Sequence, residues 1–140
     1  MKVVSILGVV VILLGSSICF GQSFTFTYID TAAFALPNTT AYLLSEIQNL
    51  LPSTQILQVA ITTDFPSPGW TANYCFAGYC YPSFLSPIPD TIMANDTDRV
   101  DLQVTPDNVG TDGWATLSVY PDGHPELAQS LTFTSTRSME

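Results

Sequence analysis

The sequence predicts an all-β fold, a two-sheet antiparallel sandwich of about seven strands. Several short segments alternate apolar and polar residues with a period of two, which is the pattern of a strand with one buried face. Clusters of Pro, Gly and Asp separate these segments and favour turns. The composition, rich in Thr and with 8 Phe, 6 Tyr and 2 Trp, suits pleated, half-buried surfaces better than helices. A length of 140 residues is enough for one domain with one core.

Residues 1–21 are expected to form a signal peptide. Lys2 precedes a mostly apolar run that is too short to cross a bilayer of ~30 Å as a helix. Cys19 and Gly21 then stand where a signal peptidase requires small side chains, whereas Ile18 before Cys19 argues against lipidation of that cysteine. We therefore expect cleavage after Gly21, export of the chain and a mature sandwich domain spanning residues 22–140.

The first half of this domain contains two clear strands and one ambiguous segment. Residues 23–29 alternate apolar and polar side chains, and residues 55–63 form a second β-rich run that ends in the turn at 64–69. Between them, the apolar positions of residues 41–51 fit either one face of a helix or a hairpin. We prefer the hairpin, because its neighbours are strands and Pro52 begins a turn.

The second half contains three more strands. Residues 99–105 alternate cleanly, with Val100, Leu102 and Val104 on one face. Residues 114–120 and 129–134 follow with the same strand-like composition. Pro, Asp, Asn and Gly mark the turns at 106–108, 110–113 and 121–123.

Removal of the signal peptide leaves two cysteines, Cys75 and Cys80. An even pair in an exported chain is expected to form a disulfide. The bridge closes a short loop and so contributes only ~2 kcal/mol, with Gly78 placed for a tight turn. Redox chemistry is not expected, because four residues separate the sulfurs and no Lys, Arg or His lies nearby.

Aromatic residues crowd around this disulfide loop. Packed against the sandwich, they would cover one end of it; displayed outward, they would offer rigid amphipathic contact area. We prefer packing and keep the outward alternative as a candidate contact surface. Its residues are Tyr74, Phe76, Tyr79 and Tyr81.

Charge excludes two classes of partner. The chain carries 3 Lys+Arg against 12 Asp+Glu, a formal net charge of −9. So few cations do not neutralise a run of phosphates or anionic lipid headgroups. We expect no nucleic-acid partner and, after signal cleavage, no membrane partner.

No catalytic, cofactor or metal site is expected. The single histidine, His124, lies in a turn, and the serines lack a nucleophile-elbow context. Blue-copper and His-rich zinc sites need more histidines than the chain has. Carboxylates could surround Ca²⁺, but turn capping is their ordinary role and no segment matches a calcium loop. These carboxylates are Asp90, Asp96, Asp98, Asp101, Asp107, Asp112 and Asp122.

The run from Asp64 through Pro66, Pro68 and Gly69 to Trp70, followed by the close cysteine pair, carries a resemblance. With the later turn at 105–113, it resembles a small immunoglobulin-like domain of secreted bacterial proteins, in which a Pro-x-Gly-Trp segment precedes a close cysteine pair. The resemblance spans roughly residues 41–134. It implies an immunoglobulin-like sandwich beside sorting or other extracellular modules, and it implies no activity and no functional residues.

Three functional hypotheses follow. We prefer a secreted, non-enzymatic module that binds or spaces other extracellular or cell-surface proteins, with the periplasm or the cell surface as alternative locations. The second hypothesis is a self-assembling filament or surface-layer subunit, in which residues 24–29 and 131–134 pair edge to edge between copies. The third is a carbohydrate-binding or carbohydrate-active protein that uses Asp and Tyr side chains.

Overall fold

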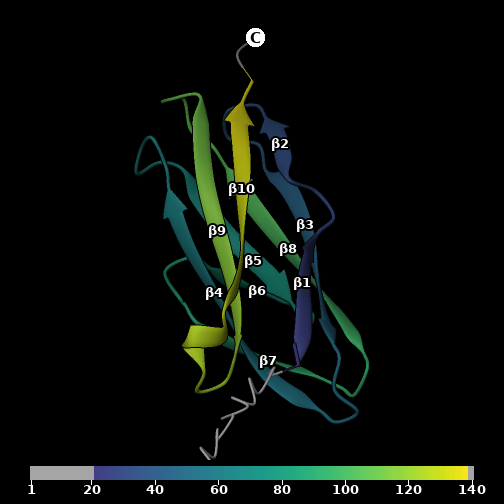
Figure 1. Ribbon diagram of the computed structural model, residues 1–140. Coiled ribbons are helices and arrows are strands. Elements are labelled where there is room, and N and C mark those ends of the chain that lie inside the picture. Colours follow the sequence, from purple (N-terminus) through teal and green to yellow (C-terminus); the bar gives the residue numbers. More distant parts are fainter. Residues whose placement is uncertain (1–20, 139–140) are drawn as a thin grey trace, which may run out of the picture.

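The computed structural model describes residues 21–138, which form two packed β-sheets (Figure 1). The expected signal peptide lies outside the described residues except for Gly21. One short 3₁₀ helix, η1 (Pro125–Leu127), accompanies the strands. The strands are β1 (Phe24–Tyr28), β2 (Ala32–Ala35), β3 (Ala41–Asn49), β4 (Gln55–Asp64), β5 (Thr71–Phe76), β6 (Tyr79–Pro82), β7 (Ile88–Ile92), β8 (Thr97–Thr105), β9 (Asp112–Pro121) and β10 (Gln129–Arg137).

The expected all-β sandwich is confirmed. Sheet A has the order β1-β3-β8-β5-β6 and sheet B the order β2-β10-β9-β4-β7. Every neighbouring pair of strands is antiparallel except β10 and β2, which are parallel. In Figure 1, β9 and β10 of sheet B lie in front of β5 and β8 of sheet A.

The described residues form ten strands rather than about seven. Four of them, β2, β5, β6 and β7, were not expected, and the three shortest lack a clear sequence signal. β2 is a run of small residues around one Phe, β6 contains a cysteine and a proline, and β7 contains Pro89. Each is an edge strand, where a proline is tolerated. Pairing with a longer neighbour, rather than local propensity, makes these segments extended.

The hairpin preferred for residues 41–51 does not form, and neither does the alternative helix. Residues 41–49 are the single strand β3, which pairs with β1 on one side and β8 on the other. Its buried positions alternate strictly and include Ser45 and Asn49. Because these two buried residues are polar, the sequence of this segment does not show the alternation of apolar and polar residues that is typical of a strand. Ser45 donates to the Val100 carbonyl, and Asn49 donates to the carbonyls of Ser53, Ile92 and Met93.

The core lies between the two sheets. Its largest fully buried aliphatic side chains alternate with less buried residues along the long strands, and each contributes about 1.5–3 kcal/mol by leaving water. They come from β3, β4, β8 and β9, the long central strands. They are Leu43, Ile47, Leu57, Val59, Val100, Leu102, Val104, Leu117 and Val119.

Trp70 and the residues around it close one end of the sandwich. Trp70 is 4% exposed, and its Nε1 donates to the Val109 carbonyl at 2.8 Å. An added Cβ at Gly113 would lie 2.7 Å from the Trp70 ring, and one at Gly110 would overlap the Pro66 ring. The Pro- and Gly-rich segments before Trp70 and after β8 therefore serve close packing in this structure.

Candidate contact surface

The hairpin of β5 and β6 carries the expected disulfide. Cys75 and Cys80 face each other in the strand register and are joined by a disulfide. Ala77 and Gly78 form the turn with positive φ angles of 50° and 80°. Gly78 adopts this conformation at no steric cost, so the turn expected between the sulfurs is present.

The aromatic group around the disulfide divides between the two alternatives. Tyr74 and Phe76 point into the core, because β5 buries every second residue starting at Ala72. Tyr81 is half-buried against their rings, with ring centroids 5.2 Å from Phe76 and 6.0 Å from Tyr74. Of the four candidate residues, Tyr79 alone is exposed, at 68%. Tyr74 and Phe76 are therefore packing residues, as the preferred interpretation expected.

The Tyr74 hydroxyl holds the loop after β6 in place through a hydrogen bond. It donates to the Leu85 carbonyl, and burial is the main cause that raises the pKa of Tyr74 above its ordinary value. Ser86 in the same loop accepts a hydrogen bond at its Oγ from the Ile61 backbone N–H on β4. The loop between β6 and β7 thus joins the two sheets on this side of the sandwich.

A small hollow of about 190 Å³ lies beside the disulfide. Residues of the hairpin turn form one wall, and Asp98, Arg99 and Asp101 form the other. No group of three or more His, Cys, Asp and Glu residues within positions 21–138 is arranged to hold a metal ion. Two carboxylates and one guanidinium line the hollow, and no chemistry is assigned to it.

His124 lies where the sequence places it, in a surface turn. Its Nδ1 is 2.9 Å from Glu126 Oε1, and both side chains are exposed. This hydrogen bond is the main cause that lowers the pKa of Glu126. Two exposed side chains two residues apart form a local pair rather than a catalytic constellation.

Most of the carboxylates flagged in the sequence accept local hydrogen bonds. Asp96 accepts from the Thr97 N–H, Asp98 from the Arg99 N–H, and Asp107 from the Val109 N–H. Asp112 accepts from Thr136 and Asp122 from Gln58 across neighbouring strands. These are the capping and cross-strand roles that favour Asp in turns. Asp90 and Asp101 are different, because Asp90 Oδ2 and Asp101 Oδ1 are buried atoms without a hydrogen-bond partner. Of the two, only Asp90 is buried as a whole residue.

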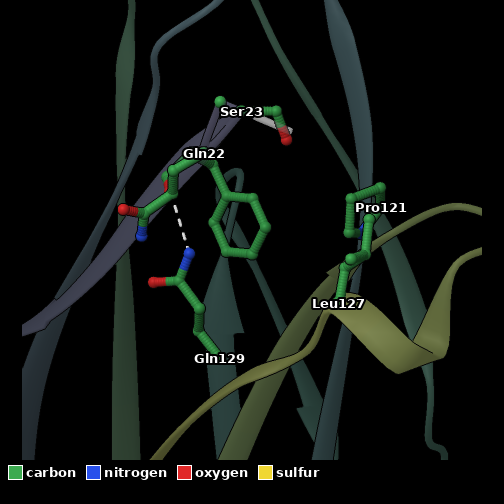
Figure 2. Close-up of a pocket in the computed structure, with 7 residues that line it drawn as sticks. Gln22, Ser23, Pro121, Leu127 and Gln129 are labelled. Atoms are coloured by element: carbon green, nitrogen blue, oxygen red, sulfur yellow. Dashed lines mark hydrogen bonds between the residues drawn. The ribbon is translucent and has the colours of Figure 1, made fainter. Parts of the chain in front are cut away.

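A larger hollow of about 390 Å³ opens where β1 begins. Figure 2 shows Gln22 and Ser23 on one side of it and Pro121 and Leu127 on the other. Gln129 at its edge donates to the Phe24 carbonyl at 2.8 Å and accepts from the Phe26 N–H at 3.0 Å. The hollow is largely apolar and has no charged side chain in its walls.

The seam between β1 and β10 is closed by two side chains. Gln129 on β10 pairs with the free backbone edge of β1, as described above. Conversely, the Tyr28 hydroxyl on β1 donates to the Thr132 carbonyl and accepts from the Thr132 N–H. Edge-to-edge pairing of residues 24–29 and 131–134 between copies would have to break these four hydrogen bonds.

The outer face of sheet B carries an array of small hydroxyl side chains. The strand register aligns them in cross-strand rows over β4, β9 and β10. Thr116 and Thr132 are hydrogen-bonded at 2.9 Å, and Ser118 and Ser130 at 2.7 Å. We call this array the hydroxyl face. It comprises Thr62, Thr116, Ser118, Ser130, Thr132 and Thr134, with Trp114 at one end.

The hydroxyl face is free of charged residues, although the protein has a net charge of −9. Acidic residues stand only at its two ends, Asp64 and Asp112 near Trp114 and Asp122 at the opposite end. Trp114 is 45% exposed there, in register with Thr134 and Asp64. The outer face of sheet A, by contrast, carries Glu46, Arg99 and Asp101 on neighbouring strands.

The sequence predicts part of the hydroxyl face. Alternation within 114–120 and 129–134 already separates the outward hydroxyls from the inward apolar residues. It does not show that these two segments lie side by side or that β4 flanks them, because strand order depends on long-range pairing. The aromatic residues around Cys75 and Cys80 instead predicted a contact surface on the other sheet.

Comparison with solved structures supports the fold. No protein-family model and no curated protein matches the sequence. The N-terminal domain of PorA is similar over 82% of this chain and 97% of that chain, with 13% identity and a TM-score of 0.58. Native E. coli alpha-2-macroglobulin is similar over 83% of this chain and 7% of its own length, with 15% identity and a TM-score of 0.55.

A third similar structure is a family 123 glycoside hydrolase from Clostridium perfringens, with 11% identity and a TM-score of 0.52. The similarity covers 84% of this chain and 27% of the hydrolase. At such identities the likeness concerns the fold alone. The chain is an immunoglobulin-like β-sandwich, similar to domains found in larger bacterial proteins. Within the part of the chain that is described, no helix has the length and apolar character to span a membrane.

Proposed function

We propose that this protein is a secreted, non-enzymatic immunoglobulin-like module that binds or spaces extracellular or cell-surface components through the hydroxyl face. The uncharged face on an otherwise acidic molecule is the observation that carries the proposal. Net negative charge keeps such a protein soluble and resists non-specific association. A face without charged residues is not kept apart from other molecules by charge repulsion. Such a face suits a specific contact, since charged residues are depleted at the centre of interfaces.

The expected signal peptide and the resemblance to small domains of secreted bacterial proteins support the extracellular part of the proposal. The disulfide agrees with it, because such bridges persist in oxidising compartments. Small hydroxyl side chains lose little rotamer freedom on contact. The Thr and Ser pairs already hold one another in place, so the face is preorganised for binding.

A charge introduced at the centre of the face tests the proposal. The protein would be immobilised and exposed to cell-surface preparations of the organism that secretes it, with the retained material quantified. We expect Thr132→Glu to reduce retention at least about tenfold, because a buried unpaired carboxylate costs several kcal/mol. Gln103→Glu on the outer face of sheet A is the matched control and should retain as much as the native protein. Equal retention by both variants would refute the assignment of the face.

Binding of a neutral glycan is a second candidate function, favoured by the exposed Trp114 ring beside hydroxyl donors. Indole faces stack on apolar surfaces, and the neighbouring hydroxyls of Thr116 and Thr134 can donate or accept hydrogen bonds. Retention of the native protein on an insoluble neutral polysaccharide, lost in Trp114→Ala, would support this candidate. Absence of retention by the native protein on a panel of such polysaccharides would remove it.

A further inference from the structure

Gln22 is the residue that the expected signal cleavage places first in the mature chain. Cys19 and Gly21 before it fit a signal peptidase, and cleavage after Gly21 gives Gln22 a free α-amino group. In the structure Gln22 is exposed and lies two residues before β1. A glutamine in the first position carries an amine and a carboxamide within one residue, close enough to react with each other.

Ser23 is the residue at which hydrogen bonds begin to hold the chain against the sandwich. Its carbonyl accepts a hydrogen bond from the Leu50 N–H at 2.9 Å, and its Oγ accepts one from Gln55 Nε2 at 2.8 Å. Gln22 precedes this anchored part and is exposed to solvent. The first residue of the mature chain is therefore accessible, both to spontaneous chemistry and to an enzyme.

The hollow beside Gln22 is a poor site for a charged amino group. It has a volume of about 390 Å³ and largely apolar walls, and Figure 2 shows Gln22 across it from Pro121 and Leu127. Leu127 is 50% exposed there, so the hollow leaves apolar surface in contact with water. An α-ammonium group next to such a surface loses hydration without gaining a hydrogen-bond partner.

The acidic residues nearest in sequence to these walls have partners of their own. Glu126 Oε1 is 2.9 Å from His124 Nδ1, and Asp122 Oδ1 accepts a hydrogen bond from Gln58 Nε2 at 2.9 Å. Neither acid lines the hollow. Of the described residues, those that line the hollow thus offer no carboxylate to pair with the amino group.

We propose that Gln22, as the first residue of the mature chain, is converted to pyroglutamate, and that its lactam ring packs against Pro121 and Leu127 in this hollow. An α-amino group is less basic than a lysine amine, so part of it is neutral and nucleophilic near neutral pH. The neutral amine attacks the side-chain Cδ and forms a five-membered lactam. The bond from Cδ to Nε2 breaks, and Nε2 leaves as ammonia with the proton that the amine gives up. The step needs no oxidant and no co-reactant.

The modified end has properties that a free glutamine lacks. A lactam has no ionisable amine, so an aminopeptidase that binds the α-ammonium group cannot remove the first residue. The ring also has no side-chain rotamers to lose on packing, and its methylene groups gain from covering apolar surface at Leu127. The modification therefore protects the end of the chain that leads into β1, an edge strand of sheet A.

Intact-mass analysis of the exported protein, directly after isolation, tests the modification. We expect the mass of residues 22–140 with one ammonia lost, a difference of about 17 Da. Gln22→Ser is the matched control, because its side chain forms no lactam. It should begin at the same position with its full mass, and an aminopeptidase should shorten it but not the native protein.

The possible masses separate the modification from the cleavage on which it rests. A native chain that begins at Gln22 with its full mass would overturn the proposal and leave the expected cleavage intact. A native chain that begins at another residue would overturn both. Neither outcome bears on the hydroxyl face, whose test is retention on cell-surface material.

Nuclear Overhauser contacts test where the ring lies. In the native protein, we expect contacts between the ring protons of the modified residue and the methyl groups of Leu127. Leu127→Ala should lose these contacts and keep the mass of the cyclised chain, because lactam formation needs only the atoms of Gln22. A ring without contacts to Leu127 or Pro121 would overturn its placement in the hollow.

Discussion

At the residue scale, Gly113 sets how closely β9 approaches the buried Trp70. An added Cβ would lie 2.7 Å from a Trp70 ring carbon and 2.8 Å from a Phe65 ring carbon. These rings pack against each other with centroids 5.6 Å apart, so neither moves without disturbing the other. We expect Gly113→Ala to lower the free energy of unfolding by about 1–3 kcal/mol, measured by urea denaturation.

Thr27→Ala is the control for Gly113→Ala, because Thr27 is exposed on β1. Substitutions at such exposed positions change the free energy of unfolding by about 0.5 kcal/mol or less. Equal effects of the two substitutions would contradict the close packing assigned to Gly113.

Gln129 supplies the second prediction at this scale. Its amide pairs with the backbone of β1 as a neighbouring strand would. Gln129→Leu leaves the Phe24 carbonyl and the Phe26 N–H without partners, and we expect a loss of about 1–3 kcal/mol in the free energy of unfolding. It should also promote concentration-dependent association in light scattering, because an edge strand is uncovered. Gln48→Leu, at an exposed position of β3, is the control and should not promote association. Association of Gln48→Leu as strong as that of Gln129→Leu would show that the added apolar surface alone is responsible.

At the element scale, the disulfide hairpin contributes modestly to stability. The bridge between Cys75 and Cys80 spans five positions of sequence, and a loop of that size is worth about 2 kcal/mol in the chain-entropy account. Reduction of the native protein should lower the free energy of unfolding by about that amount without loss of the β-sheet circular dichroism signal. Complete unfolding on reduction would show that the hairpin organises the whole sandwich.

The sequence predicted the elements unevenly, for physical reasons. β1, β4, β8, β9 and β10 were each found, because they alternate strongly and end at turn residues. β3 was misjudged because Ser45 and Asn49 are polar but buried, which only their hydrogen bonds explain. β2, β6 and β7 depend on pairing with longer neighbours. β5 alternates between buried and less buried residues, but in the sequence it was considered only as part of the disulfide segment. The candidate site was missed for the same reason, since the hydroxyl face exists only when β4, β9 and β10 are adjacent.

At the scale of the whole molecule, the dependence of stability on pH follows from two opposing groups of carboxylates. The pKa of Asp90 is raised to about 7 in the folded state, above its ordinary value of 3.8. The folded state therefore binds this proton more tightly, and stability falls as pH rises from about 4 to about 7. Repulsion among the excess acidic groups acts in the same direction.

Asp107 and Glu126 act in the opposite direction. Hydrogen bonds from Ser67 and from His124 are the main causes that lower their pKa values. Any stability they contribute is lost as pH falls through those lowered values, although both groups are exposed and the effect is small. We expect urea denaturation between pH 3 and pH 9 to give maximal stability near pH 4 to 5. Stability that rises from pH 4 to pH 7 would contradict the raised pKa of Asp90.

The most direct test of the central claim is an NMR experiment on the threonine methyl groups. Methyl signals of Thr62, Thr116 and Thr132 report on the hydroxyl face, and those of Thr25 and Thr71 report on sheet A. On addition of the retained cell-surface fraction, the account predicts broadening or shifts of the first group alone. Changes confined to the second group, or centred on the Tyr79 hairpin, would contradict the assignment of the contact surface to sheet B.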